Sequence, residues 1–339
     1  MKCPTVPQAL DDFMMHVKSE VSEASYRWYS EKLWPLYHRY SDWPVNRLTY
    51  QEGLKYKTWL REEKEWRRGK KGPVQKGLSN TTVNHHLRAA RTFLGWCSKP
   101  SRRLSYGLAV SPWEEIGYMD DKPRERLITD EEFEHLLDNC EDGNTRGAAV
   151  EMREQLLVLR FTTMRPQELR VLKWDYVQWE QHRIVFPATV VKTRKRREVS
   201  MIEVVEQALG ERRNRLEAAG VRCGARYVFP LPAHLNGVLQ AGIGDRLQSA
   251  GKFSQRFRRL VERCVAKGLI QKEKAGERIV PYSTRHTRIT ELFTEGNTQA
   301  VVMYDAGHTN PLTTERYKHL AGSHVTESIR KLSKKGGQI

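Results

Sequence analysis

The segment Phe161–Tyr176 (FTTMRPQELRVLKWDY) places an arginine where a phosphate can bind. Pro166 is favoured at the first position of a helix, so Arg165 is predicted at the N-terminal boundary of that helix. Backbone donors and the helix dipole make such a boundary attractive to phosphate, and Arg165 adds a two-pronged donor. Glu168 lies three residues on, where its carboxylate can orient the guanidinium. By itself the pattern also fits an ordinary surface arginine.

The segment Val190–Met201 (VVKTRKRREVSM) gathers cations at a predicted turn between two strands. These cations are Lys192, Arg194, Lys195, Arg196 and Arg197. One interpretation is a charged hairpin tip of a common kind. The other is a loop that enters a groove and presents one lysine to a reacting phosphate. The segment alone leaves both interpretations open.

A third segment, Pro281–Phe293 (PYSTRHTRITELF), predicts a helix that opens with Tyr282, Arg285 and His286. Gly296 ends this helix, since glycine is common just past a helix end. Its apolar side consists of Ile289, Leu292 and Phe293.

Two more short helices are predicted after that segment. The first stops at Gly307, which places His308 in the turn. Asn310 and Pro311 begin the second, which carries Tyr317. Along the second half of the chain the polar residues therefore follow the order arginine, lysine, arginine, histidine, tyrosine.

Over most of residues 127–320 this order resembles the tyrosine recombinase, or phage integrase, family. In that family an arginine opens a helix with an acid three residues later, and a lysine sits on the following hairpin. A second arginine stands in a His-x-x-Arg box, a Gly-His pair follows, and the nucleophilic tyrosine comes last. The matching positions are Arg165 with Glu168, Lys192, Arg285, Gly307 with His308, and Tyr317. The separations, 23 residues from Arg285 to His308 and 9 from there to Tyr317, also fit the family pattern.

The resemblance implies a phosphoryl transfer that needs no metal and no cofactor. Arg165 and Arg285 would neutralise the non-bridging oxygens, with His308 as a further donor. Tyr317 would attack phosphorus to give a 3′-phosphotyrosine and a free 5′-hydroxyl. Lys192 would protonate the leaving oxygen as general acid. The implied activity is site-specific recombination, for integration or excision of a mobile element.

Two positions depart from the family pattern. Thr163 stands where the family usually has a glycine, two residues before the first arginine, so the turn there is expected to differ in detail. Tyr282 stands where the family usually has a histidine. A neutral phenol donates a hydrogen bond well but accepts a proton poorly at pH 7, which leaves the general base unassigned.

The resemblance also implies partners and leaves alternatives. The partners are double-stranded DNA with specific recombination sites and, on DNA, a homotetramer; free in solution the chain would be a monomer or weak oligomer. Alternatives are DNA relaxation of the type IB topoisomerase kind and a DNA-binding regulator with a decayed active site. A metal-dependent nuclease is poorly supported, because no acidic cluster with a clear ligand pattern occurs.

The elements that position these residues predict a mainly α fold with a small antiparallel sheet, of the α+β class. Residues 1–111 are predicted to be helical, and the resemblance implies that they form a core-binding (SAM-like) DNA-binding domain. The Gly- and Pro-containing segment 112–126 is expected to be a linker. Residues 127–322 form the catalytic domain. The tail 323–339 is either a helix exchanged between protomers or a frayed terminus.

One predicted helix of the first domain begins after a capping Ser79 and carries a possible DNA-binding face. Its apolar stripe contains Val83, Leu87, Ala90, Leu94 and Cys97. The opposite side gathers Asn84, His85, Arg88, Arg91 and Lys99, with three cations and no acid. That face suits either solvent or a phosphate backbone. Arg88, Arg91 and Lys99, with Arg194 and Arg196 of the hairpin, are the predicted DNA contacts.

Charge agrees with a polyanionic partner. The formal net charge is +17, and the surplus is shared almost equally between residues 1–118 and 119–339. The five cysteines are scattered without the spacing of a zinc site, so they are predicted to be free thiols in a reducing cytoplasm. No stretch is apolar and long enough for a signal peptide or a membrane span.

Overall fold

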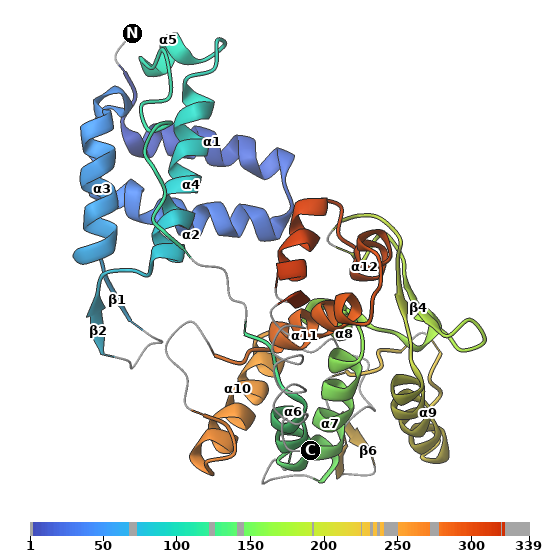
Figure 1. The fold of residues 1–339 in the computed structure, drawn as a ribbon. Helices are drawn as coiled ribbons and strands as arrows, with labels where there is room; N and C mark the ends of the chain where they lie inside the picture. Colours follow the sequence, from blue (N-terminus) through green and yellow to red (C-terminus); the bar gives the residue numbers. More distant parts are fainter. Residues whose placement is uncertain are drawn as a thin grey trace. The chain divides into compact units, whose positions relative to one another are not determined.

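The computed structural model divides into two compact units, Met1–Pro123 and Arg124–Ile339 (Figure 1). The two units are described separately below. The structure describes residues 3–67, 73–121, 126–140, 146–191, 193–224, 226–230, 233–235, 238–240, 250–271, 278–319 and 321–322.

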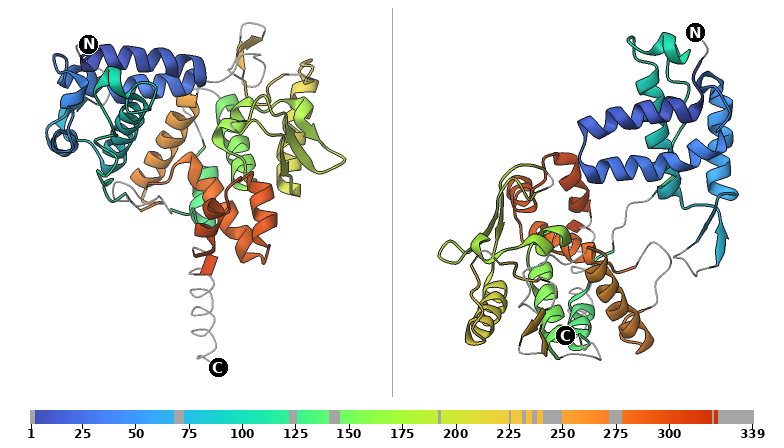
Figure 2. Two further views of the ribbon diagram at one scale, coloured as in Figure 1. Left: turned by 90° about the horizontal axis from the view of Figure 1, so that it is seen from above. Right: turned by 180° about the vertical axis from the view of Figure 1, so that it is seen from behind.

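The first unit is helical, and its four longest described helices each begin at a capping hydroxyl. Thr5, Ser22, Thr49 and Ser79 accept hydrogen bonds from backbone N–H groups one turn on, which satisfies donors that a helix start leaves free. The helices are α1 (Val6–Glu20), α2 (Glu23–Arg39), η1 (Val45–Arg47), α3 (Tyr50–Glu62), α4 (Asn80–Cys97) and α5 (Arg103–Tyr106). Helices α1 and α2 lie side by side, and α4 packs against both (Figures 1 and 2).

Helix α4 confirms the predicted stripe and corrects one residue of its outer face. The apolar residues of the stripe are fully buried: Val83, Leu87, Ala90, Leu94 and Cys97. Asn84, expected on the outer face, is instead buried. Its side chain donates to the Met119 carbonyl at 2.9 Å and accepts from the Met119 N–H at 2.7 Å. The chain beyond α4 therefore returns to cover this side of the helix.

The expected linker over 112–126 is wrong for its first part. Trp113 and Ile116 are buried in the core of the first unit, and the Trp113 indole donates to the Thr49 carbonyl at 3.0 Å. A large aromatic side chain gains most from burial when its N–H finds an acceptor, so this segment is held in the unit. Glycine and proline content alone did not reveal it.

The charged stretch after α3 contains two short strands. They are β1 (Glu65–Arg67) and β2 (Val74–Lys76), which pair antiparallel. The Trp66 indole donates to the Gly77 carbonyl at 2.7 Å. Gly77 has a φ of 75°, a left-handed conformation that glycine adopts without strain.

The second unit confirms a mainly helical fold with a small antiparallel sheet. Strands β3 (Val177–Gln178), β4 (Arg183–Phe186) and β5 (Arg197–Ser200) form a sheet in that order, with Ile184 opposite Val199. Two more strands, β6 (Ala233–Leu235) and β7 (Val238–Gln240), pair separately and were not predicted. The helices are α6 (Asp130–Asp138), α7 (Arg146–Arg160), α8 (Pro166–Val171), η2 (Trp174–Tyr176), α9 (Glu203–Ala218), α10 (Ala250–Ala266), α11 (Pro281–Thr294) and α12 (Gln299–Ala306). Residues 311–319 are also helical.

Helix α7 organises this unit, because it packs against α8, α9 and α11. Its last residue, Arg160, is buried and pairs with Asp130 at 2.8 Å and with Glu291 at 2.5 Å. One guanidinium thus ties the start of α6 and the last turn of α11 to the end of α7, directly before the segment that leads to Arg165. Among the described residues, no helix is long and apolar enough to cross a membrane.

Candidate active site

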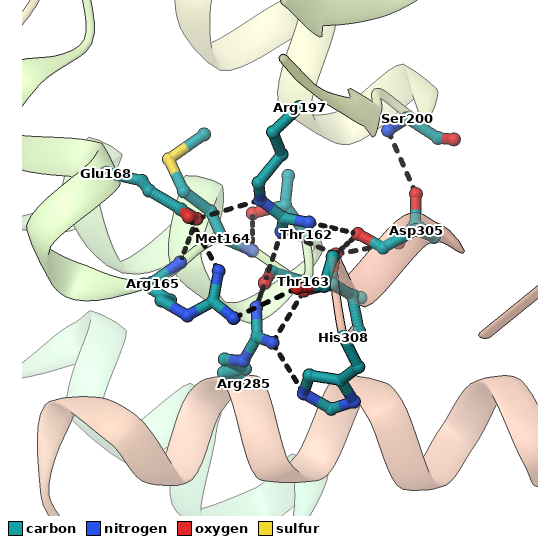
Figure 3. Close-up of polar contacts among 12 residues, drawn as sticks. Thr162, Thr163, Met164, Arg165, Glu168, Arg197, Ser200, Arg285, Asp305 and His308 are labelled. Carbon is teal, nitrogen blue, oxygen red and sulfur yellow. Dashed lines mark hydrogen bonds and ion pairs between the residues drawn. The ribbon is translucent and has the colours of Figure 1, made fainter. Parts of the chain in front are cut away.

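Arg165 stands at the N-cap of α8, with Pro166 at the first helical position as the sequence predicts. Its backbone N–H donates to Glu168 Oε2 at 2.8 Å, and its Nη1 donates to Glu168 Oε1 at 2.8 Å (Figure 3). Nη2 reaches the Gly307 carbonyl at 3.3 Å. Burial lowers the pKa of Arg165, but Glu168 and a hydrogen bond with Tyr282 raise it above its usual value. Arg165 is therefore a fixed cation, and Glu168 orients it as expected.

Arg197 is a member of the cluster that the sequence interpretation missed. It was counted with the cations of the hairpin tip, yet its side chain is 3% exposed and its Nε donates to Glu168 Oε2 at 3.1 Å. It also donates to the carbonyls of Thr163 at 3.0 Å and Asp305 at 2.9 Å (Figure 3). The available signal was the alternation of β5, since residues two apart share a face and Arg197 shares one with the buried Val199.

Glu168 therefore lies between two guanidiniums. Burial raises the pKa of its carboxyl, but the charges of Arg197 and Arg165 outweigh burial and hold the pKa below its usual value. The carboxylate is ionised at neutral pH and fixes both arginines.

Thr163 occupies the position at which the family usually has a glycine. Its φ is negative, so no left-handed backbone conformation is needed there. Its hydroxyl donates to Asp305, at 2.8 Å from Oδ2, and the other carboxylate oxygen of Asp305 accepts from the Ser200 N–H at 3.1 Å. Its carbonyl accepts hydrogen bonds from Arg197 and Arg285. The threonine thus joins the turn before α8 to β5, α11 and α12 (Figure 3).

Arg285 lies in the first turns of α11 and is fully buried. Its Nη1 donates to the Thr163 carbonyl, and its Nη2 donates to the Ala306 carbonyl at 2.7 Å and to His308 Nε2 at 2.9 Å. Its buried Nε has no hydrogen-bond partner among the residues described. Burial and the charge of Arg165 lower its pKa to about 10, so it remains a cation at neutral pH.

His308 follows Gly307, which ends α12 with a φ of 61°. A Cβ at residue 307 would lie 2.3 Å from Arg197 Nη1, so the close approach also requires glycine. His308 Nδ1 lies 2.7 Å from the Thr314 hydroxyl. Burial and the nearby arginines, Arg285 first, lower the pKa of His308 to about 3. The ring is therefore neutral, with Nε2 accepting from Arg285 and Nδ1 donating to Thr314.

Tyr317 lies on the helix 311–319 and is 2% exposed. Its ring stacks near that of His308, with centroids 6.2 Å apart, and its hydroxyl lies 2.6 Å from His286 Nδ1. Burial raises the pKa of Tyr317, against the opposing effect of Arg316 and Arg285. The contact with His286 was not foreseen, although the sequence placed His286 near the start of the helix that proves to be α11.

Tyr282 lies one turn before His286 on α11 and is 39% exposed. Its ring centroid is 5.2 Å from that of His286, and its hydrogen bond with Arg165 adds to the effect of Glu168 in raising the pKa of that arginine. The structure thus places the Tyr282 hydroxyl beside Arg165.

The remaining predicted residues lie elsewhere. Lys192 lies outside the described residues, as does the tail 323–339. Arg194 is exposed, and Arg196 pairs with Glu198 at 2.9 Å. In the first unit, Arg88 and Lys99 are exposed, whereas Arg91 pairs with Glu114 at 3.3 Å, an acid the sequence argument had not counted on that face.

The cluster can bind an anion and activate a hydroxyl. Three guanidiniums (Arg165, Arg197, Arg285) face two carboxylates (Glu168, Asp305), and both histidines beside Tyr317 are neutral. Within the described part of the chain, no group of three or more histidine, cysteine or acidic residues can hold a metal ion, and all five cysteines are free.

Comparisons with known proteins bear on what this site does. Residues 126–324 match the family model described as the phage integrase family, whereas none of the curated proteins compared matches the chain. Tn1549 transposon integrase in complex with transposon right end DNA superposes with a TM-score of 0.69 at 17% identity, covering 96% of this chain and 100% of that one. A lambda integrase dimer bound to a COC′ core site gives 0.64 at 13% identity, with 94% and 78% covered. XerH site-specific recombinase bound to a palindromic difH substrate gives 0.51 at 17% identity, with 74% and 67% covered. At these identities the likeness is one of fold.

Proposed function

The chain belongs to the phage integrase family, and from that premise we propose that Tyr317 cuts DNA by attacking a backbone phosphate held by Arg165 and Arg285. As a tyrosine recombinase, the chain cleaves and rejoins DNA strands. The roles of its individual residues are the proposal.

The observation that carries the proposal is the convergence of the two arginines. Arg165 donates to the Gly307 carbonyl, and Arg285 donates to the adjacent Ala306 carbonyl at the end of α12 and to the Thr163 carbonyl in the turn before α8. Arg165, whose side chain is 19% exposed, is the member a phosphate meets first. The spare Nε–H of Arg285 can donate to a second phosphate oxygen. Because Arg285 and Tyr317 are buried, side chains must rearrange when DNA binds.

In the reaction, fixed cations stabilise the charge that develops on the phosphate oxygens. Tyr317 forms the bond to phosphorus, the bond to the 5′-oxygen breaks, and a 3′-phosphotyrosine results. Lys192 donates the proton that the 5′-oxygen needs. A 5′-hydroxyl of another strand then reverses the step, so no ATP and no metal are needed. His308 becomes a phosphate donor only if Arg285 releases its Nε2, since that nitrogen now accepts from Arg285.

Further parts of the proposal concern the rest of the chain. The first unit acts as the core-binding domain, and its exposed Arg88 and Lys99 contact the DNA backbone. In the catalytic unit, the exposed Arg194 of the hairpin makes a contact of the same kind. On its recombination sites the chain forms a tetramer, as strand exchange between two duplexes requires four cleavages. Free thiols fit a cytoplasmic enzyme, and the biological use is integration or excision of a mobile element.

Covalent capture tests the nucleophile and finds the DNA site together. The full chain is incubated with nicked duplexes of random sequence, and DNA that stays attached after denaturation is sequenced. We expect wild type to enrich one sequence, with or without EDTA. The Tyr317→Phe variant should retard that duplex in a native gel but form no adduct.

Each other outcome contradicts a stated part of the proposal. An adduct with Tyr317→Phe refutes the assignment of the nucleophile. Relaxation of supercoiled plasmid without a specific site and without recombinants favours a topoisomerase-like enzyme. No adduct from wild type, with DNA binding retained, favours a regulator with a decayed active site.

A further inference from the structure

Two titratable side chains lie close to the Tyr317 hydroxyl, those of His286 and Arg316, and of these two only the imidazole can accept a proton at neutral pH. His286 Nδ1 lies 2.6 Å from the Tyr317 oxygen, and the two rings have centroids 5.5 Å apart at an angle of 31°. Both side chains are buried, with exposed fractions of 9% and 2%. A hydrogen bond of this length between a phenol and an imidazole is the geometry required of a nucleophile and its general base.

Two other ring side chains near Tyr317, those of Tyr282 and His308, are poorly suited to take its proton. Tyr282 is itself a phenol, so it accepts a proton weakly at neutral pH. His308 already accepts from Arg285 through Nε2 and donates to Thr314 through Nδ1, so neither ring nitrogen has a free lone pair.

We infer that His286 is the general base that accepts the proton of Tyr317 during DNA cleavage and returns it during rejoining. The inference rests on the proposed function, because it assigns a partner to the proposed nucleophile. As Tyr317 O bonds to phosphorus, its proton moves to His286 Nδ1, and the 5′-oxygen leaves with the proton that Lys192 donates in the proposed function. In rejoining, the imidazolium gives the proton back to the phenolic oxygen as the phosphotyrosine bond breaks.

The surroundings of His286 support a neutral, accepting ring. Burial and the charges of Arg316 and Arg285 lower the pKa of His286 to about 4, so at neutral pH the imidazole is uncharged and one of its ring nitrogens has a free lone pair. The same two arginines oppose the effect of burial on Tyr317 and so favour its phenolate. A bound phosphodiester compensates the charge of Arg285, which raises the pKa of the imidazole and strengthens it as a base.

The position of His286 also relates it to the departure at residue 282. Four residues separate Tyr282 from His286, so the two side chains lie on one face of α11. The imidazole that the family carries at the first position of its second box is absent here, and an imidazole stands one turn further on. Arg285, next to His286 in sequence, holds the phosphate in the same proposal.

The test uses the full chain and a nicked duplex of the captured sequence. His286→Asn keeps an amide oxygen near the position of Nδ1, so it can accept the hydrogen bond of Tyr317 but cannot take its proton. We expect adduct formation at pH 7 to slow by about 10²- to 10⁴-fold, the range for loss of a general base. The rate should then rise with pH, as hydroxide replaces the missing base. His286→Ala should be equally slow and regain activity when imidazole is added.

Controls separate this role from others. His182→Asn makes the same change at an exposed residue whose φ of 51° suits asparagine, and should cleave like wild type. With sulfur as the bridging leaving atom, no proton is needed there, so His286→Asn should remain slow; recovery to the wild-type rate would place His286 on the leaving group and overturn the inference. His286→Gln serves as a second variant if the asparagine variant does not fold.

Two further results would also overturn it. A His286→Asn rate within about threefold of wild type would mean that hydrogen bonding alone suffices, since a lost general base costs far more. A rate above wild type would mean that His286 only holds Tyr317 in its buried position. Failure of the proposed function is distinct, because wild type itself would then form no adduct.

Discussion

Replacement of Glu168 by glutamine removes the charge that holds two arginines while keeping the shape of the side chain. In the structure the carboxylate accepts from the Arg165 N–H at 2.8 Å, from Arg165 Nη1 at 2.8 Å and from Arg197 Nε at 3.1 Å. An amide has one acceptor oxygen. If that oxygen occupies the site of Oε2, two of these bonds remain, and the NH₂ group faces Arg165 Nη1. The guanidinium of Arg165 is therefore the group released.

The size of the effect follows from burial. Glu168 is 4% exposed and Arg197 is 5% exposed, so neither charge is well solvated. Removing one partner of such a buried ion pair costs about 3–5 kcal/mol, because the remaining charge lacks compensation. For a unit of this size that corresponds to a melting temperature lower by roughly 10 °C. Cleavage should fall by about 10²-fold, as when one fixed donor to a developing oxyanion is lost.

Thermal unfolding and adduct formation on the captured duplex measure the two effects. Glu180→Gln is the matched control, since Glu180 is exposed. The difference from wild type should shrink in acid: the folded pKa of Glu168 lies below the usual 4.5, so its contribution is present above that pH and lost below it. A melting temperature equal to that of the control, with wild-type cleavage, would refute the ion pairing on which the argument rests.

Three more predictions address other residues. Tyr282→Phe should keep cleavage within about tenfold of wild type, because a phenol adds little as a base; loss as complete as that of the nucleophile variant would contradict this. His86 is buried, with Nδ1 2.7 Å from the Lys32 carbonyl, and burial lowers its pKa to about 4. As the pH falls below 6.5, the imidazole of residue 86 takes up a proton in the unfolded chain but not in the folded one, so the free energy of unfolding decreases between pH 6.5 and 4. His86→Asn should reduce this pH dependence, measured by urea titration, by about 1.4 kcal/mol per pH unit. Thr163→Val removes the donor to Asp305 and should destabilise by about 1–3 kcal/mol, whereas Thr163→Ser should remain near wild type in thermal unfolding.

Helix starts and strand pairing were predictable because their signals are local. Thr129 and Glu132 form a capping box, and Ser79 caps α4 as predicted, in each case through atoms three residues apart. The strands β3, β4 and β5 follow from short runs of branched and aromatic residues. In contrast, the burial of Trp113 depends on the Thr49 carbonyl, far away in sequence, so the same Gly- and Pro-containing segment fits a linker or a packed arm.

Within the site, too, arginines fixed by sequence neighbours were predictable and an arginine fixed by distant residues was not. Arg165 was placed by its neighbours Pro166 and Glu168, whereas Arg197 is fixed by carbonyls at residues 163 and 305. A run of five cations gives no means of choosing the buried one, except that alternation along β5 turns Arg197 inward with Val199. Applying the two-residue period of a strand to the charged hairpin would have distinguished the buried Arg197 from its exposed neighbours.

Tyr282 replaces the family histidine at one position of α11, but side chains four residues apart on a helix lie on the same face. At a rise of about 1.5 Å per residue, four residues move a side chain about 6 Å along the axis and leave it on the same side. The phenol of residue 282 therefore lies near Arg165 and Arg285, and the imidazole of residue 286, on the same side of the helix, lies against the Tyr317 hydroxyl. The separations of 23 and 9 residues set the order of the groups along the chain. Which ring meets the hydroxyl is decided by how the helix 311–319 packs on α11, and no spacing in the sequence encodes that.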